Sequence, residues 1–229
     1  MKRNENQGIL LFIKYPEIDK VKSRLSKSID KRSVVTIYKL FVEDILFKLK
    51  DTSYDKIICY YPENDIDKFK GWLGTNYLYV PQIGRNLGER LKNCFKTCFL
   101  LGYSKLVAIG SDSPDLKLDI IIEAIEKIDN YHAVIGPCID GGYYLIGFSK
   151  KNFYPDIFND IPWSTKEVFK MTIDVFSKAN RNVHILPEWY DVDTINDLFD
   201  LYKKNLKSDF KNTKTMKYLT EFYKKTKSI

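Results

Sequence analysis

Short apolar runs alternate along this sequence with longer amphipathic segments, and few folds accommodate such a pattern. The apolar runs are rich in β-branched residues and do not alternate with a period of two, which indicates strands that are buried on both faces. Strands of that kind belong to mainly parallel sheets with helices on either side. The pattern therefore predicts an α/β fold, in which a single doubly wound, mainly parallel sheet is flanked by helices.

This alternation also predicts where the elements lie. Six apolar runs and one aromatic run after a pair of glycines are expected to form strands, over residues 9–13, 56–61, 77–80, 105–109, 133–137, 143–148 and 182–186. The amphipathic segments are expected to form helices over 33–49, 65–73, 88–101, 119–128, 165–178, 194–205 and 214–224. No internal repeat or low-complexity linker is visible. The chain is therefore predicted to form one domain over residues 1–202, followed by a basic helical tail over 203–229.

The position of the net charge decides what it says about partners. The chain has 229 residues, is 44% hydrophobic as expected for a globular protein, and carries a formal charge of +7. Residues 203–229 contain nine lysines and two acidic residues, so residues 1–202 are formally neutral. We expect the tail to present a solvated basic helix face, with an anionic partner as the alternative. The sequence gives no clear sign of nucleic-acid binding, and it does not predict the oligomeric state.

Neither a signal peptide nor a membrane span is predicted, because Lys14 interrupts the first apolar run far below spanning length. The cysteines form no CxxC pair, and His132 and His184 are too scattered to complete a zinc site. We therefore expect a cytoplasmic protein with four buried, reduced thiols. These are Cys59, Cys94, Cys98 and Cys138.

A loop with four cations follows the first predicted strand, within residues 14–25. Ligands of open α/β sheets bind outside the carboxyl ends of the strands, which is where this loop is expected to lie. Lys14, Lys22 and Arg24 suit a diphosphate or triphosphate, whose charge needs several fixed donors. Neither a P-loop nor the glycine pattern of a dinucleotide-binding fold is present. A solvated surface loop is the alternative.

An aspartate, Asp112, follows the fourth predicted strand. A carboxylate at the end of a buried strand must be hydrogen-bonded, paired or bound to a metal ion. Its hard oxygen atoms suit Mg²⁺ or Mn²⁺ that bridges phosphates. The alternative is that Asp112 or Ser113 caps the next helix, with Pro114 in its first turn. For Asp115, capping is the favoured interpretation.

Paired glycines follow the fifth predicted strand, in the segment Asp140-Gly141-Gly142. Adjacent glycines permit a backbone course that lets a ligand approach closely, and an Asp-Gly hairpin turn is the alternative. Further along, Trp163 precedes a predicted helix and either belongs to the core or forms a wall of an acceptor pocket. Ser164 is the expected N-cap of that helix.

Asp193 and Thr194 lead into the helix expected over 194–205, where Thr194 could cap the helix and leave Asp193 free as a second carboxylate. Taken in order, these segments resemble the GT-A-type glycosyltransferase family named for arsenosugar biosynthesis, which was long a domain of unknown function. The resemblance extends over residues 8–202 and does not cover the tail. It is carried by six stretches: 14–25, 82–91, 110–116, 140–147, 161–168 and 191–198.

The resemblance implies a nucleotide-diphospho-sugar transferase-like fold, with nucleotidyltransferases such as phospholactate guanylyltransferase among the broader relatives. It also implies a set of site residues at the matching positions. Phosphates would be bound by Lys14, Lys22 and Arg24, the base by Gln82 with Leu87 and Gly88, and a divalent metal by Asp112 and Asp193. The family usually has glycine in place of Asp19, threonine in place of Ser23 and an acidic residue in place of Asn86, which leaves the course of the basic loop open.

Two transfer reactions would use these residues. In glycosyl transfer, Mg²⁺ or Mn²⁺ would bridge the phosphates of a nucleotide sugar, and Asp140 would orient or deprotonate the hydroxyl of a small-molecule acceptor. The acceptor pocket would include Gly141, Gly142 and Trp163. The alternative is nucleotidyl transfer, in which a phosphorylated small molecule attacks a nucleoside triphosphate and pyrophosphate leaves. A non-enzymatic binding module that uses the basic tail is a third hypothesis. The first two need the same loop and the same metal aspartate, so the sequence separates them poorly.

Overall fold

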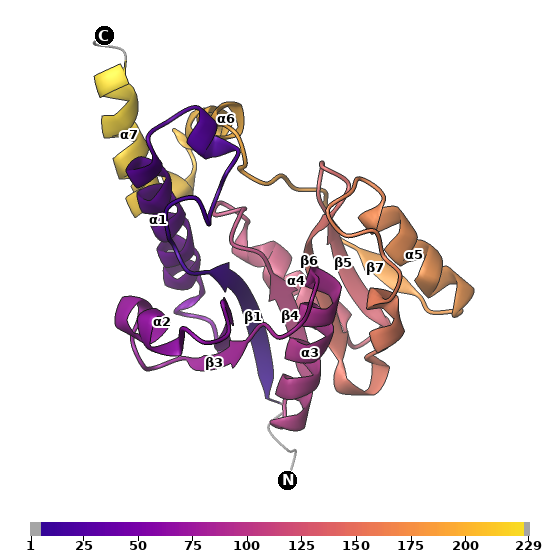
Figure 1. Cartoon of the computed structure of the whole chain (residues 1–229). Coiled ribbons are helices and arrows are strands. Elements are labelled where there is room, and N and C mark those ends of the chain that lie inside the picture. The colour runs from indigo at the N-terminus through magenta and orange to yellow at the C-terminus, as the bar shows by residue number, and fades with distance from the viewer. Residues whose placement is uncertain (1–5, 227–229) are drawn as a thin grey trace.

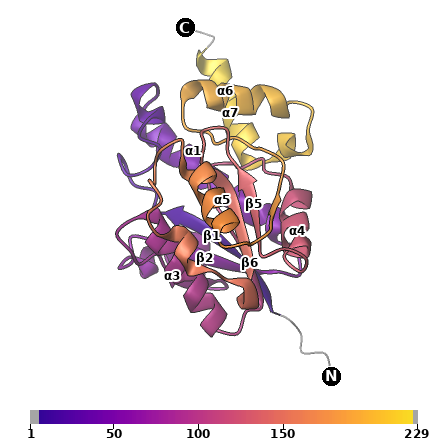
Figure 2. The same ribbon diagram turned by 90° about the vertical axis from the view of Figure 1, so that its right-hand side faces the viewer.

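The computed structural model describes residues 6–226 and contains a seven-stranded sheet with helices on both faces (Figure 1, Figure 2). The strands are β1 (Gln7–Lys14), β2 (Asp55–Tyr61), β3 (Leu78–Pro81), β4 (Lys105–Ile109), β5 (Ala133–Pro137), β6 (Tyr143–Ser149) and β7 (Val183–Ile185). The helices are α1 (Lys31–Leu49), α2 (Ile66–Leu73), α3 (Leu87–Leu100), α4 (Leu118–Lys127), α5 (Val168–Lys178), α6 (Ile195–Asn205) and α7 (Lys214–Thr226). Every expected strand and helix is present, with small shifts at the ends.

The strands lie in the order β3-β2-β1-β4-β6-β5-β7 across the sheet. Neighbouring strands are parallel except at β6, which pairs antiparallel with both β4 and β5. The predicted doubly wound, mainly parallel sheet is therefore confirmed. The chain builds outward from β1 to β3 and then returns to place β4 on the other side of β1. Such a reversal opens a crevice at the carboxyl ends of the two central strands.

Both faces of the sheet are covered, and this explains why the apolar runs do not alternate. Along β1, Ile9 and Leu11 pack in the core that contains residues of α1, α2 and α4, whereas Leu10 and Phe12 pack in the core that contains residues of α3. All four side chains are buried. A strand with two covered faces favours an apolar residue at every position, as in the sequence.

Capping side chains determine where three helices begin. Asp30 accepts a hydrogen bond from the N–H of Ser33 at the start of α1, and Asn86 caps α3 in the same way. At α6, Thr194 and Asp197 form a capping box, in which each side chain accepts a hydrogen bond from the other residue's N–H. The cap expected at Thr194 is therefore confirmed.

The cap expected at Ser164 is wrong. Helix α5 begins at Val168, and Ser164 lies before it with a φ of 69°. An extra turn separates the two, because the Thr165 hydroxyl donates to the carbonyl of Pro162 and accepts from the N–H of Glu167. Local side-chain bonding of this kind competes with helix formation.

Helix α4 also begins later than a cap at the strand end would require. Its first residue is Leu118, and the residue at the N-cap position is Lys117. Neither Asp112 nor Ser113 caps it, and the capping role favoured for Asp115 is wrong. The carboxylate of Asp115 instead accepts hydrogen bonds from Trp189, Tyr190 and Asn205, which hold the segment before α6 and the end of α6 against the β4–α4 loop.

The C-terminal helices share a core with the N-terminal half of the chain. Residues of α6 and α7 pack with α1 and with Leu25 in a third apolar cluster, and Figure 1 shows α7 beside α1. Asp44 of α1 accepts hydrogen bonds from the N–H groups of Lys214 and Thr215 at the start of α7. The boundary expected after residue 202 falls inside α6.

All four cysteines are buried and none is in a disulfide, as predicted. Within residues 6–226, no helix combines the length and the apolar character that a membrane crossing requires.

Candidate functional site

Two adjoining cavities lie at the carboxyl ends of the strands. The first, of about 550 Å³, is bounded by the ends of β1 and β4, the loop after β1 and the start of α3, and its lining includes Lys14 and Gln82. The second, of about 540 Å³, is bounded by the β5–β6 turn and residues 163–168, and its lining includes Asp140 and Trp163. Seven residues line both: Arg24, Leu87, Asp112, Tyr143, Ser164, Asp191 and Asp193. The boundary between the cavities is therefore rich in carboxylates.

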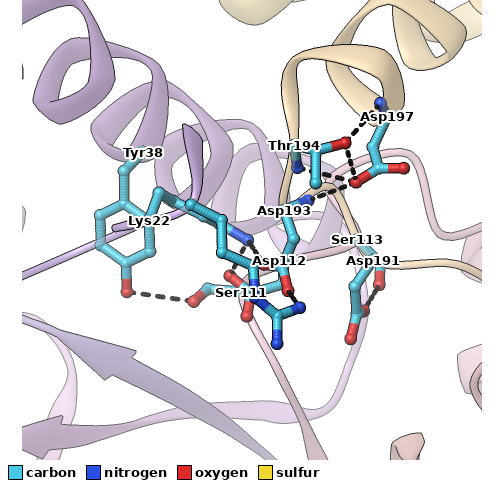
Figure 3. Close-up of polar contacts among 10 residues, drawn as sticks. Lys22, Tyr38, Ser111, Asp112, Ser113, Asp191, Asp193, Thr194 and Asp197 are labelled. Carbon is cyan, nitrogen blue, oxygen red and sulfur yellow. Dashed lines mark hydrogen bonds and ion pairs between the residues drawn. The ribbon is translucent and has the colours of Figure 1, made fainter. Parts of the chain in front are cut away.

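A cluster of one ammonium group and two carboxylates occupies this boundary (Figure 3). The Nζ atom of Lys22 lies 2.5 Å from Oδ1 of Asp112 and 3.1 Å from Oδ1 of Asp193. The other oxygen of Asp193 accepts a hydrogen bond from Nη1 of Arg24 at 3.3 Å. Asp112 and Asp193, which are 81 residues apart in sequence, thus share a single cation.

Three elements bring these side chains together. Asp112 follows β4, and its carbonyl accepts a hydrogen bond from the N–H of Val192 at 2.9 Å, which ties the segment before α6 to the end of β4. The capping box of α6 orients the residue before it, because the N–H of Asp193 also donates to Asp197. Lys22 lies in the loop after β1 and has a φ of 47°, in the left-handed region that non-glycine residues seldom adopt.

The charges of the cluster support one another despite burial. Burial lowers the pKa of Lys22, but the carboxylates of Asp112 and Asp193 outweigh it, so the pKa lies above the ordinary value of 10.5. The ammonium is therefore retained at neutral pH. Its side chain is only 3% exposed, whereas those of Asp112 and Asp193 are 43% and 35% exposed, so water reaches the ion pairs from the carboxylate side.

A third carboxylate, Asp191, adjoins the cluster and was missed in the sequence. Burial and then the nearby charge of Asp112 raise its pKa to about 6, although the Ser113 hydroxyl donates to it at 2.7 Å. Cys138, Asp140 and Asp191 each offer an atom that could bind a metal, and these atoms lie within 4.8 Å of one another. Burial raises the pKa of Cys138, and a sulfur ligand suits Mg²⁺ or Mn²⁺ less well than the carboxylates of Asp140 and Asp191 do. Asp191 falls in the stretch 191–198 that carries the family resemblance, and this position was its signal in the sequence.

The loop around Lys14 is held by hydroxyl groups. The Tyr38 hydroxyl accepts a hydrogen bond from the N–H of Lys14 at 2.9 Å and lies 3.1 Å from the hydroxyl of Ser111. Burial raises the pKa of Tyr38 to about 12, so the phenol stays neutral. The side chain of Lys14 lines the first cavity together with Lys22 and Arg24, and all three predicted phosphate ligands therefore face one space.

Gln82, a predicted base ligand, already uses the NH₂ group of its side-chain amide in hydrogen bonds to the backbone. Its side chain is buried, and Nε2 donates to the carbonyls of Ile13 at 3.1 Å and Cys59 at 2.7 Å. Both amide hydrogens bridge the ends of β1 and β2. Gln82 lines the first cavity, so its carbonyl oxygen is the group left for a ligand there.

Gly88, which was also predicted to contact the base, has a role in packing. It is buried in the first turn of α3, and a Cβ atom placed on it would lie 2.5 Å from the indole of Trp163. It lines neither of the two cavities. Trp163 packs on the core around Phe158, as one of the two expectations has it, and it also lines the second cavity.

The β5–β6 turn is the hairpin that the sequence left as an alternative. Asp140 Oδ1 accepts from the N–H of Gly142 at 2.9 Å, and Gly141 has a φ of 91°. The close approach at Gly141 is made by the backbone of Lys166, which would lie 2.2 Å from an added Cβ. Asp140 and Gly142 line the second cavity, whereas Gly141 lines neither cavity.

Two other residues of the cavities were not singled out in the sequence. Arg90 lines the first cavity, where it donates to the carbonyl of Gly84 at 3.0 Å and lies over the ring of Tyr61. Tyr143 lines both cavities, and its buried hydroxyl has no hydrogen-bond partner among residues 6–226. Arg90 falls in the stretch 82–91 that carries the family resemblance, so its position was the only available signal.

A model of the protein family described as an uncharacterized protein conserved in bacteria (DUF2064) matches residues 47–165. This stretch includes Gln82, Asp112 and Asp140, whereas Lys22 and Asp193 lie outside it. The comparison with curated proteins found no match.

Solved structures share the fold. A crystal structure from Desulfovibrio desulfuricans G20, provisionally named a nucleotide-diphospho-sugar transferase, is 40% identical over 95% of each chain, with a TM-score of 0.91. The CMP:2-keto-3-deoxy-manno-octonic acid synthetase complexed with CTP has a TM-score of 0.54 at 8% identity, over 86% of this chain and 97% of that one. The 4-diphosphocytidyl-2C-methyl-D-erythritol synthase from Anaerococcus prevotii DSM 20548 has a TM-score of 0.56 at 12% identity, over 88% and 99%. The last two likenesses concern the fold alone.

Proposed function

This chain belongs to the family described as an uncharacterized protein conserved in bacteria (DUF2064), and we propose that it is a metal-dependent glycosyltransferase. It would move a sugar from a nucleotide-diphospho-sugar donor to a small acceptor, as the resemblance to the arsenosugar-biosynthesis glycosyltransferases implies. One observation carries the proposal. Asp112 and Asp193 share a cation at the boundary between two cavities, each of which is large enough for a small molecule.

The two carboxylates fit a divalent metal ion. They come from different elements, they already surround one positive charge, and their oxygen atoms are the ligands that Mg²⁺ and Mn²⁺ prefer. Asp191 lines both cavities beside them and adds negative charge near the ion's position. An ion held there would supply positive charge to the leaving diphosphate.

The first cavity suits the nucleotide part of the donor. Lys14, Lys22 and Arg24 line it and would pair with the phosphates, whose charge needs several fixed donors. The carbonyl oxygen of Gln82 would accept a hydrogen bond from an N–H group of the base. The phosphates would then lie next to Asp112, with the sugar directed towards the second cavity.

The second cavity suits the acceptor. Its walls combine the aromatic side chains of Trp163 and Tyr143 with the carboxylate of Asp140. An aromatic wall favours the apolar face of a small molecule, and a carboxylate can orient a hydroxyl group and take its proton. We assign that role to Asp140, because the turn fixes its carboxylate through the N–H of Gly142.

The direct test is incubation of the purified protein with a panel of nucleotide sugars, Mn²⁺ and small hydroxyl acceptors. We expect transfer, or slow hydrolysis of the correct donor, and a loss in kcat/KM of about 100-fold or more for Asp112→Asn, which weakens the metal site. Asp119→Asn is the matched control, because Asp119 is exposed on α4 and lines neither cavity. A well-folded protein that neither transfers nor hydrolyses any donor would contradict the proposal.

Nucleotidyl transfer to a phosphorylated small molecule is the second candidate. It is favoured by the number of cations, because Arg90 joins Lys14, Lys22 and Arg24 in the first cavity and four cations suit a triphosphate. Release of pyrophosphate from a nucleoside triphosphate in the presence of phosphorylated acceptors would identify this reaction. Release of a nucleoside diphosphate from a nucleotide sugar would identify the first.

A further inference from the structure

Lys22 has two possible partners in the site. In the structure its ammonium lies between Asp112 and Asp193, 2.5 and 3.1 Å from their Oδ1 atoms. Lys22 also lines the first cavity, where a nucleotide's phosphates would need a cation. One ammonium group cannot pair fully with both, so the contacts of Lys22 depend on what else the site holds.

A divalent ion and the Lys22 ammonium compete for the same oxygen atoms. Three of the four carboxylate oxygens of Asp112 and Asp193 already contact a cation, two of them Lys22 and the third Arg24. An ion bound through both carboxylates would lie within a few ångströms of Nζ. Solvent reaches the two carboxylates, whose side chains are 43% and 35% exposed, but not the Lys22 side chain at 3%, so it screens the repulsion between the two cations only in part.

Release of Lys22 would involve a short piece of chain. The residues on either side, Val21 and Leu25, are buried in separate apolar clusters and hold the loop in place. Between them Lys22 has a φ of 47°, a conformation that persists only where the surroundings hold it. Ion pairs with Asp112 and Asp193 hold the Lys22 ammonium, and loss of these contacts would free it without moving the loop as a whole.

We infer that Lys22 and a divalent ion exclude each other at Asp112 and Asp193, so that metal binding transfers the lysine from the carboxylates to the phosphates of the nucleotide. The inference rests on the metal site of the proposed function. It follows that the affinity of the site for the metal depends on whether a nucleotide is bound. Metal alone binds weakly because it must displace Lys22, and metal together with a nucleoside diphosphate binds tightly because the diphosphate receives the displaced ammonium.

Titration with Mn²⁺ alone, followed by the electron paramagnetic resonance signal of free Mn²⁺, tests the competition. Lys22→Met should bind Mn²⁺ about tenfold or more tightly than the wild type, because the competing cation is gone. Lys20→Met is the matched control. It removes the same charge from the same loop, but Lys20 is exposed and contacts neither carboxylate, so its effect should stay below about threefold. Equal or weaker Mn²⁺ binding by Lys22→Met would overturn the inference.

The same titration in the presence of a nucleoside diphosphate provides the second half of the test. The diphosphate should increase the Mn²⁺ affinity of the wild type more than that of Lys22→Met, because only the wild type has an ammonium to transfer. An equal increase in both proteins would overturn the transfer to the phosphates.

A measurement on the wild-type chain removes any dependence on the folding of variants. Lys22 should react slowly with an amine-acylating reagent in the presence of a chelator and faster after addition of Mn²⁺ alone, as read by mass spectrometry of the peptide. Unchanged reactivity would overturn the inference. These experiments contain neither donor sugar nor acceptor. A protein that transfers sugar but fails them therefore loses only the competition, and one that passes them without transferring sugar loses only the proposed function.

Discussion

The amide of Gln82 lies between the ends of two strands, and both of its hydrogens go to backbone carbonyls, those of Ile13 and Cys59. A residue singled out for contact with a base therefore has a structural task first. The same holds for Gly88, whose missing side chain leaves room for the indole of Trp163. At the scale of single residues, positions matched by the family resemblance therefore have structural roles beside the binding roles proposed for them, and substitutions can separate the two.

Gln82→Glu should lower the free energy of unfolding by on the order of 2–4 kcal/mol at pH 8, because a buried carboxylate would face two carbonyls with no hydrogen to donate. Urea denaturation measures this. Gln82→Met is the control that removes the hydrogen bonds without adding charge, and it should cost less. A Gln82→Glu variant as stable as the wild type would show that the amide is not needed between the strands.

Gly88→Ala should destabilise the protein by about 1–3 kcal/mol, because the new methyl group would lie 2.5 Å from the Trp163 indole. The matched variant is Gly71→Ala in α2, where an added Cβ meets nothing within 4 Å. There the substitution should stabilise by about 0.5–1 kcal/mol through helix propensity. Thermal unfolding of both variants gives the comparison, and two changes of the same sign would refute this account of Gly88.

The start of α6 is the element on which the position of Asp193 depends. Its capping box joins Thr194 to Asp197, and the N–H of Asp193 donates to the same Asp197 carboxylate. The helix therefore begins next to Asp193, a predicted metal ligand. The Asp197 side chain takes part in the helix cap and also orients Asp193.

Thr194→Ala should cost about 0.5–2 kcal/mol of stability through loss of the cap. It should also weaken Mn²⁺ binding, because the residue before the helix loses its fixed orientation. Thr194→Ser keeps the hydroxyl and should restore both properties. The measurements are urea denaturation and Mn²⁺ titration, and a variant with a weakened helix but unchanged Mn²⁺ affinity would argue against the link.

At the scale of the whole molecule, α1 connects the parts that form the site. Its residues pack with α6 and α7 on one side and with the sheet on the other. Near its end, Nζ of Lys48 donates to the carbonyls of Pro114 and Leu116 after β4 and lies 5.7 Å from the ring of Phe210. The two cavities are lined by residues between Phe12 and Asp193, and α1 connects the segments that hold them to the C-terminal helices.

Lys48 makes the stability of this assembly depend on pH. Burial lowers its pKa to about 8, although Asp115 and Asp44 oppose the shift, whereas the unfolded chain keeps the ordinary value of 10.5. Between these values the unfolded state binds more protons, so stability should rise with pH by up to about 1.4 kcal/mol per unit, relative to a Lys48→Met variant. Below about pH 8 the difference between the two proteins should be constant. Urea denaturation at several pH values gives this difference, and a constant difference from pH 7 to 10 would contradict the shift.

Much of the fold could be predicted because burial affects each strand separately. Runs such as 105–109 and 133–137 are apolar at every position, and this is visible in the residues themselves. The predicted carboxylates Asp112 and Asp193 were also recognisable, since one follows a buried strand and the other precedes a capped helix. By contrast, the late start of α5 depends on local bonding by Thr165, which a count of apolar residues does not contain.

The sequence by itself therefore determined the doubly wound sheet, the order of its elements and the chemical character of the segments at the strand ends. Only the tertiary structure decided that Lys22 lies between Asp112 and Asp193, that Asp191 lines both cavities beside them, and that Gly88 faces Trp163. The physical reason is that these interactions connect residues over different separations in the sequence. Burial of an element is expressed along its own residues, whereas an ion pair or a close contact depends on the distance between side chains that the packing of α1, α6 and the sheet brings together.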